Sequence, residues 1–184
     1  MVVAHARLDR VTQSAFLWLV ITFAALLSLP RIFAREEDKG TAVALRMMAM
    51  PSAVFIAKWL FNAGFTTMIA IVLYLLAIPL WQLHQEAQVA WISVTIFTLA
   101  LSTLSITVAG TFLGALIAKV QRRASLMGII AFPALLPALV PAVHCTNACL
   151  SKHPIPIAQL VWLALYAMLT LVLSLMLFEH VWRD

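Results

Sequence analysis

Residues 31–50 read Arg-Ile-Phe-Ala-Arg-Glu-Glu-Asp-Lys-Gly-Thr-Ala-Val-Ala-Leu-Arg-Met-Met-Ala-Met, and Pro51 follows them. The segment holds three of the seven acidic residues and four of the twelve basic residues in a chain of 184. An apolar run long enough to cross a bilayer lies on either side of it, so we expect the segment at a membrane face. Its charges therefore determine how the remaining runs are oriented.

The first half of this segment is typical of a short amphipathic helix on the membrane surface. At helical spacing Phe33 and Glu36 fall near one another, while Arg35 and Asp38 turn to the other side. Gly40 is a residue that often ends a helix, because it accepts the left-handed conformation at low cost. The alternative is a solvated loop whose charges only fix the topology.

The composition identifies the class of protein. Hydrophobic residues make up 64% of the chain and charged residues 10%, and the mean hydropathy is +1.03. A soluble domain has roughly 45–50% apolar and about 25% charged residues, so this is an integral membrane protein. The net charge of +5 does not require nucleic acid, because basic residues beside apolar runs are expected of a multi-pass membrane protein.

Five apolar runs predict five membrane-spanning helices, and about 20 residues suffice for one span. The predicted helices cover residues 11–29, 52–79, 89–118, 124–143 and 157–178. Backbone groups in lipid must be hydrogen-bonded internally, and these runs are too long and too uniform for barrel strands. The sequence therefore predicts an all-α integral membrane fold, with residues 1–184 forming one domain and residues 31–50 forming a cytoplasmic segment.

The distribution of basic residues predicts the orientation of the helices. If residues 31–50 are cytoplasmic, eight basic residues lie on that side and three on the other. The eight are Arg31, Arg35, Lys39, Arg46, Lys119, Arg122, Arg123 and Arg183, and the three are Arg7, Arg10 and Lys152. Lys58 is expected to extend its side chain back to the cytoplasmic face. The C-terminus is then cytoplasmic, and with five helices the N-terminus is outside.

Several segments together resemble a known family, the cytochrome c maturation protein B (CcmB) family, over residues 16–178. They are Arg-Ile-Phe-Ala-Arg-Glu-Glu-Asp-Lys-Gly-Thr at 31–41, Ala-Lys at 57–58, Gly-Ala-Leu-Ile-Ala-Lys-Val-Gln-Arg-Arg-Ala-Ser-Leu-Met at 114–127 and Phe-Pro-Ala-Leu-Leu-Pro-Ala-Leu-Val-Pro at 132–141. The resemblance implies a family that usually has six spanning helices, of which this chain lacks the first.

The resemblance also implies a function. Members of this family are described as haem exporter proteins that form the permease of an ABC-type complex in cytochrome c maturation. The implied partners are a soluble ATPase subunit (CcmA-like), other haem-handling maturation proteins and the lipid bilayer. The implied location is the inner membrane of a bacterium, ahead of the mitochondrial inner membrane. Haem is implied as a handled ligand, which the complex either exports or releases on a loaded chaperone, and not as a permanent cofactor.

The chain contains no Gly-x-x-x-x-Gly-Lys-Ser/Thr phosphate-binding motif, so ATP hydrolysis must come from another chain and this chain is not an enzyme. The surface segment is then the expected contact with the ATPase. Its proposed coupling residues are Arg35, Glu36, Glu37, Asp38, Lys39, Gly40 and Thr41. An intramembrane enzyme or proton-coupled transporter is disfavoured, because Lys58 is the only ionisable residue in the predicted spans. A membrane scaffold without transport activity remains the alternative.

Two predicted spans have features that bear on packing and movement. Gly110 and Gly114 form a small-residue face on the third, used for packing within the chain or between subunits. Pro133, Pro137 and Pro141 recur every four residues in the fourth, which is expected to be bent or partly unwound. The prolines mark either a hinge or a static kink.

Four residues that can bind metals are close together after the fourth predicted helix: His144, Cys145, Cys149 and His153. We expect them in an outer loop, where the cysteines either form a disulfide or remain free thiols. Ligation of a metal or of haem iron by these four residues is the alternative. The spacing matches neither covalent haem attachment nor a standard zinc site, so ligation is the less favoured interpretation.

Overall fold

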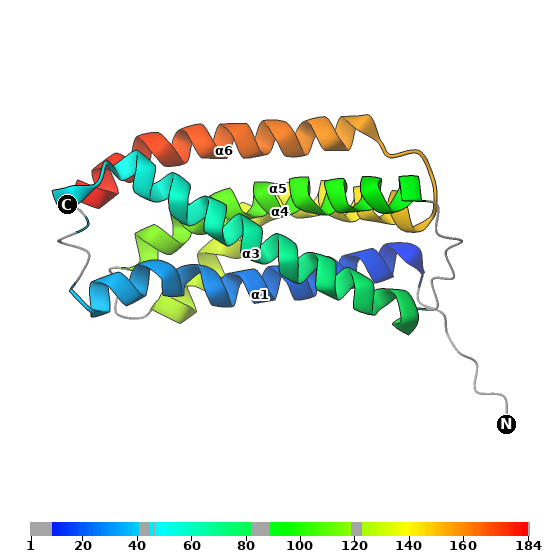
Figure 1. Ribbon diagram of the computed structural model, residues 1–184, viewed down its shortest axis with the longest axis horizontal. Helices are drawn as coiled ribbons and strands as arrows, with labels where there is room; N and C mark the ends of the chain where they lie inside the picture. Colours follow the sequence, from blue (N-terminus) through cyan, green and yellow to red (C-terminus); the bar gives the residue numbers. More distant parts are fainter. Residues whose placement is uncertain (1–8, 41–44, 46, 82–88, 119–122, 184) are drawn as a thin grey trace, which may run out of the picture.

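The computed structural model describes residues 9–40, 45, 47–81, 89–118 and 123–183, and in this part of the chain every regular element is an α-helix. Five long helices lie side by side in one elongated bundle (Figure 1). They are α1 (Arg10–Asp38), α3 (Pro51–Leu80), α4 (Val89–Ala118), α5 (Arg123–Leu150) and α6 (Ile157–Arg183). All five are long and apolar enough to cross a membrane, which confirms the predicted all-α membrane fold.

The course of α1 corrects one expectation. A separate surface helix was expected after residue 29, but α1 continues without interruption to Asp38. The physical reason is that the buried stripe of α1 continues as well: Phe33 lies 11 residues, or three turns, after the buried Thr22 and is itself buried. The helix then ends as expected, with Gly40 in the left-handed region at φ 67°.

The central element of the bundle is α4, which packs against each of the other four described helices. About 56% of its apolar span is buried inside the protein, compared with 11% for the span in α6. Many of its buried side chains are serine or threonine: Thr95, Thr98, Ser102, Thr103, Ser105, Thr107 and Thr111. Several of these hydroxyls donate to carbonyls one turn earlier in α4, which satisfies them without any charged group.

Some of the buried hydroxyls on α4 also connect it to α3 and α6. The Asn62 side-chain amide of α3 donates to Thr111 Oγ1 at 3.0 Å, and Thr67 and Thr103 share a hydrogen bond of 2.6 Å. Ser105 Oγ donates to the Leu163 carbonyl of α6 at 3.0 Å. In membrane proteins such bonds are worth about 0.6 kcal/mol on average, so their main effect is to fix register.

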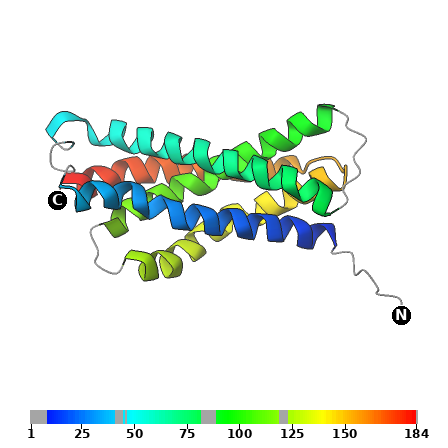
Figure 2. The same ribbon diagram turned by 60° about the horizontal axis from the view of Figure 1, so that its bottom comes forward.

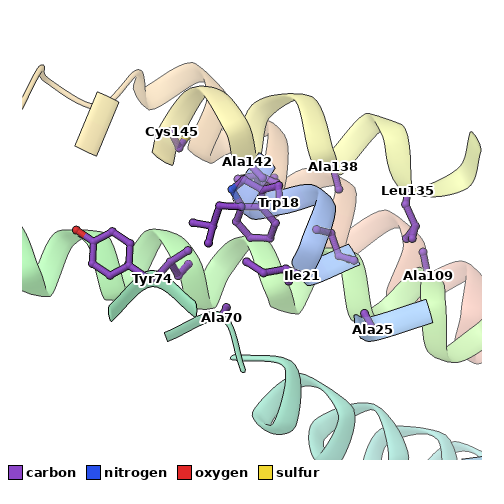
Figure 3. Packing of buried hydrophobic residues seen from close by; sticks show 14 of the residues in the cluster. Trp18, Ile21, Ala25, Ala70, Tyr74, Ala109, Leu135, Ala138, Ala142 and Cys145 are labelled. Atoms are coloured by element: carbon purple, nitrogen blue, oxygen red, sulfur yellow. The ribbon is translucent and has the colours of Figure 1, made fainter. Parts of the chain in front are cut away.

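The main hydrophobic core is formed where α1, α4 and α5 meet. Trp18 is fully buried, and Figure 3 shows its ring directed toward α5 near Ala142. Small residues on α5, among them Ala138 and Ala142, allow the large ring to fit between the helices. The Trp18 indole nitrogen donates to Thr146 Oγ1 at 2.9 Å, so the polar part of the side chain is satisfied as well.

The course of α5 corrects a second expectation. The fourth span was expected to end at residue 143, yet the helix passes all three prolines and continues to Leu150. It therefore is not unwound at the prolines. It ends where the His153 N–H donates to the Ala148 carbonyl at 2.9 Å and the Lys152 N–H to the Cys149 carbonyl at 3.3 Å. This is a Schellman motif, and Lys152 occupies its left-handed position at φ 54°.

The prolines of α5 are compensated by the neighbouring helix. Proline has no N–H, so Pro141 leaves the carbonyl of Pro137 without its usual helical donor. The indole nitrogen of Trp162 in α6 donates to that carbonyl at 3.0 Å. One turn further along α6, the Tyr166 hydroxyl donates to the Ala134 carbonyl at 2.5 Å. Trp162 thus supplies the donor that Pro141 removes, and Tyr166 adds a second hydrogen bond between α6 and α5.

The bundle has two ends of different character. The turn after α1, the start of α3, the end of α4, the start of α5 and the end of α6 lie together at one end, as Figures 1 and 2 show. We call it the Phe33 end, after the α1 residue buried there. The opposite part is called the Trp18 end, which contains the start of α1, the end of α5 and the start of α6.

Candidate functional site

The charged segment begins as the last two turns of α1 at the Phe33 end. Lys39 and Gly40 form an exposed turn directly after the helix. Four of the proposed coupling residues belong to α1 itself, and they are Arg35, Glu36, Glu37 and Asp38. The directions of their side chains, and all of Thr41, lie outside the described residues. The structure thus places the start of the segment on a rigid helix, while its role in coupling stays a prediction.

An exposed methionine group follows in the same segment, just before α3. Met47, Met48 and Met50 have 79%, 87% and 76% of their surface exposed. Flexible, polarizable side chains of this kind adapt to irregular partner surfaces. The Phe33 end thus has exposed apolar side chains as well as the exposed Lys39. The sequence pattern alone did not mark these methionines as candidate residues.

Beneath this surface the segment is anchored in a second, smaller hydrophobic core. Phe33 of α1, Phe55 of α3 and Phe178 of α6 are all buried there. The Phe178 ring lies 6.0 Å from the Phe33 ring and 5.2 Å from the Phe55 ring, both centroid to centroid and both tilted. Such tilted pairs are the favoured arrangement of aromatic rings. This aromatic cluster joins α1 and α3 to α6, which lies far along the sequence.

Lys58 of α3 takes part in the same cluster. Only 8% of its surface is exposed, and its ammonium nitrogen lies 4.3 Å from the centroid of the Phe33 ring. The ammonium thus lies beside a ring at the end of the bundle that the predicted topology places in the cytoplasm, and its extension to the membrane face stays a prediction. Lys58 is the one charged residue buried in the described part of the chain. A buried cation in a membrane span is costly and usually has a functional role.

At the Trp18 end, the structure separates the four candidate ligands. Cys145 and Cys149 lie in α5 and are fully buried free thiols, with no disulfide between them. His144 and His153 are exposed. The cysteines face the bundle because polar partners exist there: Cys149 Sγ lies 3.8 Å from Thr98 Oγ1. The expected outer loop before residue 151 is wrong, and no group of three or more metal-ligating side chains occurs among the described residues.

The two remaining sets of candidate residues are the glycines of α4 and the prolines of α5. Gly110 and Gly114 are buried in the central helix α4. Pro133 and Pro137 are exposed on α5, and Pro141 is buried. Close packing at the glycines and a hinge at the prolines stay predictions.

The aromatic cluster and Lys58 were missed as a site for an identifiable reason. The three phenylalanines belong to three separate apolar runs, where any apolar residue is expected to face either lipid or core. One signal was available: the predicted topology places Phe33, Phe55 and Phe178 near the same membrane face. The other signal was Lys58, the single ionisable residue in the predicted spans, which lies in the same region of the chain as Phe55.

Comparisons with known proteins add a family to this description. A family model described as CcmB protein matches residues 4–183. A protein of Rhodobacter capsulatus named heme exporter protein B is 33% identical over 130 residues, which covers 69% of this chain and 57% of that protein. The match thus spans little more than half the length of this relative. No solved structure matches the chain.

Proposed function

The chain belongs to the CcmB family, and on this premise we propose that it is the membrane permease of an ABC-type complex that handles haem for cytochrome c maturation. In this proposal a separate soluble ATPase subunit supplies the energy, and the chain itself is not an enzyme. The name of the relative, heme exporter protein B, supports haem as the handled ligand. The inner membrane of a bacterium is the proposed location, and the other haem-handling maturation proteins are proposed neighbours.

One observation carries the proposal: the most charged segment of the chain is built on the end of a spanning helix and anchored in the bundle core. An ATPase subunit needs a surface outside the lipid and a rigid connection from that surface to the spans. Residues 31–50 combine both, since α1 runs unbroken to Asp38 and Phe33 is buried between helices. A loop that only fixed topology would need neither feature.

The proposed docking surface has a charged part and an apolar part. The charged part is Arg35, Glu36, Glu37, Asp38, Lys39, Gly40 and Thr41, and the apolar part is Met47, Met48 and Met50. Charges across an interface set specificity and orientation, while apolar anchors supply most of the affinity. The ATPase subunit is therefore expected to present a basic groove with an apolar floor.

Reversing the acidic part of this surface tests the proposal. In the variant Glu36→Lys, Glu37→Lys, Asp38→Lys, like charges would face each other across the interface, at a cost of several kcal/mol. Each 1.4 kcal/mol is a factor of about ten in affinity, so retention of the ATPase should fall by orders of magnitude on mild detergent extraction. Insertion should be unchanged, because acidic residues contribute little to orientation.

Two controls make the result specific. Glu36→Gln alone removes one charge, and because a single surface ion pair is worth about 0–1 kcal/mol, its effect should be mild. Asp9→Lys changes charge at the Trp18 end and should leave ATPase retention unchanged. If the triple variant is inserted normally and still retains the ATPase at the wild-type yield, the segment is a topogenic loop and the proposal is wrong. A bound ATPase whose turnover is independent of this chain would favour a scaffold.

A further inference from the structure

The aromatic cluster at the Phe33 end is the connection between the charged segment and the rest of the bundle. Among the described side chains of residues 31–50, those packed into the protein are Phe33, Leu45 and Ala49, and all three contact this cluster. The other described ones, including Lys39 and Met48, are exposed. Among the described side chains, this cluster is thus the connection through which movement of the segment can reach the bundle, besides the continuous backbone of α1.

The cluster reaches every helix that a displaced segment would have to move. Phe55 and Val54 come from the start of α3, Ala115 from the end of α4 and Phe178 from the end of α6. The main core is a separate cluster that runs along the bundle, from Trp18 and Cys145 to Ile117 and Ala131. Phe178 touches both other rings, so it connects α6 to α1 and α3 at once.

Lys58 makes this connection resistant to separation. Its ammonium lies 4.3 Å from the Phe33 ring centroid inside an apolar span. Cation–π attraction is stronger where water is excluded, and withdrawing the ring would leave the charge with less compensation. Phe33 and Lys58 are thus held together, while the ring contacts around them have no directional hydrogen bonds and can slide without breaking.

We infer that the Phe33–Lys58–Phe178 cluster transmits movement of the ATPase-docking segment to α3 and α6, with Phe33 and Lys58 as positioning residues. This inference rests on the proposed function and assigns a role to residues below the docking surface. The cluster does not bind the ATPase. A variant that disrupts the cluster should therefore still bind the ATPase but transmit less movement. A variant of the surface charges cannot show this difference, because it loses the ATPase itself.

A fluorescent reporter on α6 tests the inference in the complete complex. Met176 is 66% exposed and lies two residues before Phe178, so Met176→Cys can carry an environment-sensitive fluorophore. The native cysteines are buried and should not be labelled. In the otherwise wild-type complex, addition of ATP should shift the emission. Phe33→Leu and Lys58→Met should each retain the ATPase at the wild-type yield but reduce the shift about thirtyfold, the scale of a desolvated cation–π contact.

Conservative and control variants distinguish transmission from general packing damage. Lys58→Arg keeps the cation and should keep the shift, whereas Phe23→Leu makes the same change on a lipid-exposed part of α1 and should have no effect. The double variant Phe33→Leu, Lys58→Met should lose less than the sum of the two single losses, because the two residues share one contact. A full emission shift in both Phe33→Leu and Lys58→Met, with the ATPase still bound, overturns this inference but not the proposed function. Failure of the unaltered chain to retain an ATPase overturns the proposed function as well.

Discussion

The two ends of the bundle are held together by different kinds of contact. At the Trp18 end, side-chain hydrogen bonds cross between helices, from Trp18 to Thr146 and from Cys149 to Thr98. At the Phe33 end, the buried rings of Phe33, Phe55 and Phe178 pack with the Lys58 ammonium, in addition to the hydrogen bond from Asn62 of α3 to Thr111 of α4. Hydrogen bonds fix distance and angle, whereas ring contacts tolerate sliding. The end that carries the charged segment therefore contains ring contacts that tolerate sliding as well as a bond that fixes distance.

This difference also separates stability from function. Residues of the Trp18 end should matter first for the free energy of unfolding, since they fill the main core. Residues of the Phe33 end should matter first for communication with the segment. The following experiments are ordered from the largest expected effect to the smallest.

Labelling from one side of the membrane tests whether the two ends face different compartments. His153→Cys at the Trp18 end should react with an impermeant maleimide added outside intact cells, while Lys39→Cys at the Phe33 end should react only after permeabilisation. The contrast should be all or none. Wild-type protein is the control, because its two buried cysteines should react only after unfolding. Labelling of Lys39→Cys in intact cells would reverse the assignment of the ends.

Truncation of the central aromatic residue tests the structural role of the Trp18 end. Trp18→Ala removes a fully buried ring and its hydrogen bond, so the free energy of unfolding should fall by about 3–5 kcal/mol. Unfolding in mixed micelles with increasing strong detergent measures this change. Phe23→Ala on the exposed face of the same helix should change stability by less than about 0.5 kcal/mol. Equal losses for both variants would contradict a core at Trp18.

The hydrogen bond of Trp18 is tested separately by an isosteric change. Thr146→Val keeps the shape of the side chain but leaves the buried indole N–H without its acceptor. A loss of about 0.6–1.7 kcal/mol is expected from bonds of this kind in membranes. Thr170→Val is the matched control, because the hydroxyl of Thr170 bonds to carbonyls within α6. If the two variants are equally stable, the bond does not distinguish this end.

The smallest effect concerns the turn that ends α5. Lys152 has a positive φ that costs a non-glycine residue roughly 1–2 kcal/mol. Lys152→Gly removes this strain, and after the entropy cost of glycine a gain of about 0.5–1 kcal/mol in unfolding free energy is expected. Ser151→Gly, one residue earlier and without a positive φ, should destabilise by a similar amount. Stabilisation by both variants would show that flexibility, and not relief of strain, is the cause.

The sequence predicted the elements whose signals are local. The third run, residues 89–118, has the same bounds as α4, because it is uniformly apolar and contains no proline. The end of α5 was missed because Pro141 and the polar residues after it look like a loop. In the folded chain those residues find partners on other helices, such as Trp18 for Thr146, and such partners are not visible in a local pattern.

The candidate site was predicted only where its signals are local in the sequence. The charged segment was identified from its composition, and Gly40 as the end of its helix from its backbone freedom. The continuity of α1 through residues 30–38 was missed, because helical periodicity is the same in one long helix and in two short ones. The cluster of Phe33, Phe55 and Phe178 depends on the packing of three separate runs, for which no periodicity exists.

The contact between Trp162 and the Pro137 carbonyl has a consequence for biosynthesis. The span in α5 is the least apolar of the five, and the span in α6 is the most apolar. While α5 alone is in the membrane, Pro141 leaves the Pro137 carbonyl facing lipid without a donor, and such a group is costly there. Trp162 arrives only with α6. The two helices are therefore expected to leave the insertion machinery as a hairpin. Translation of α6 then supplies the hydrogen-bond donor that α5 lacks.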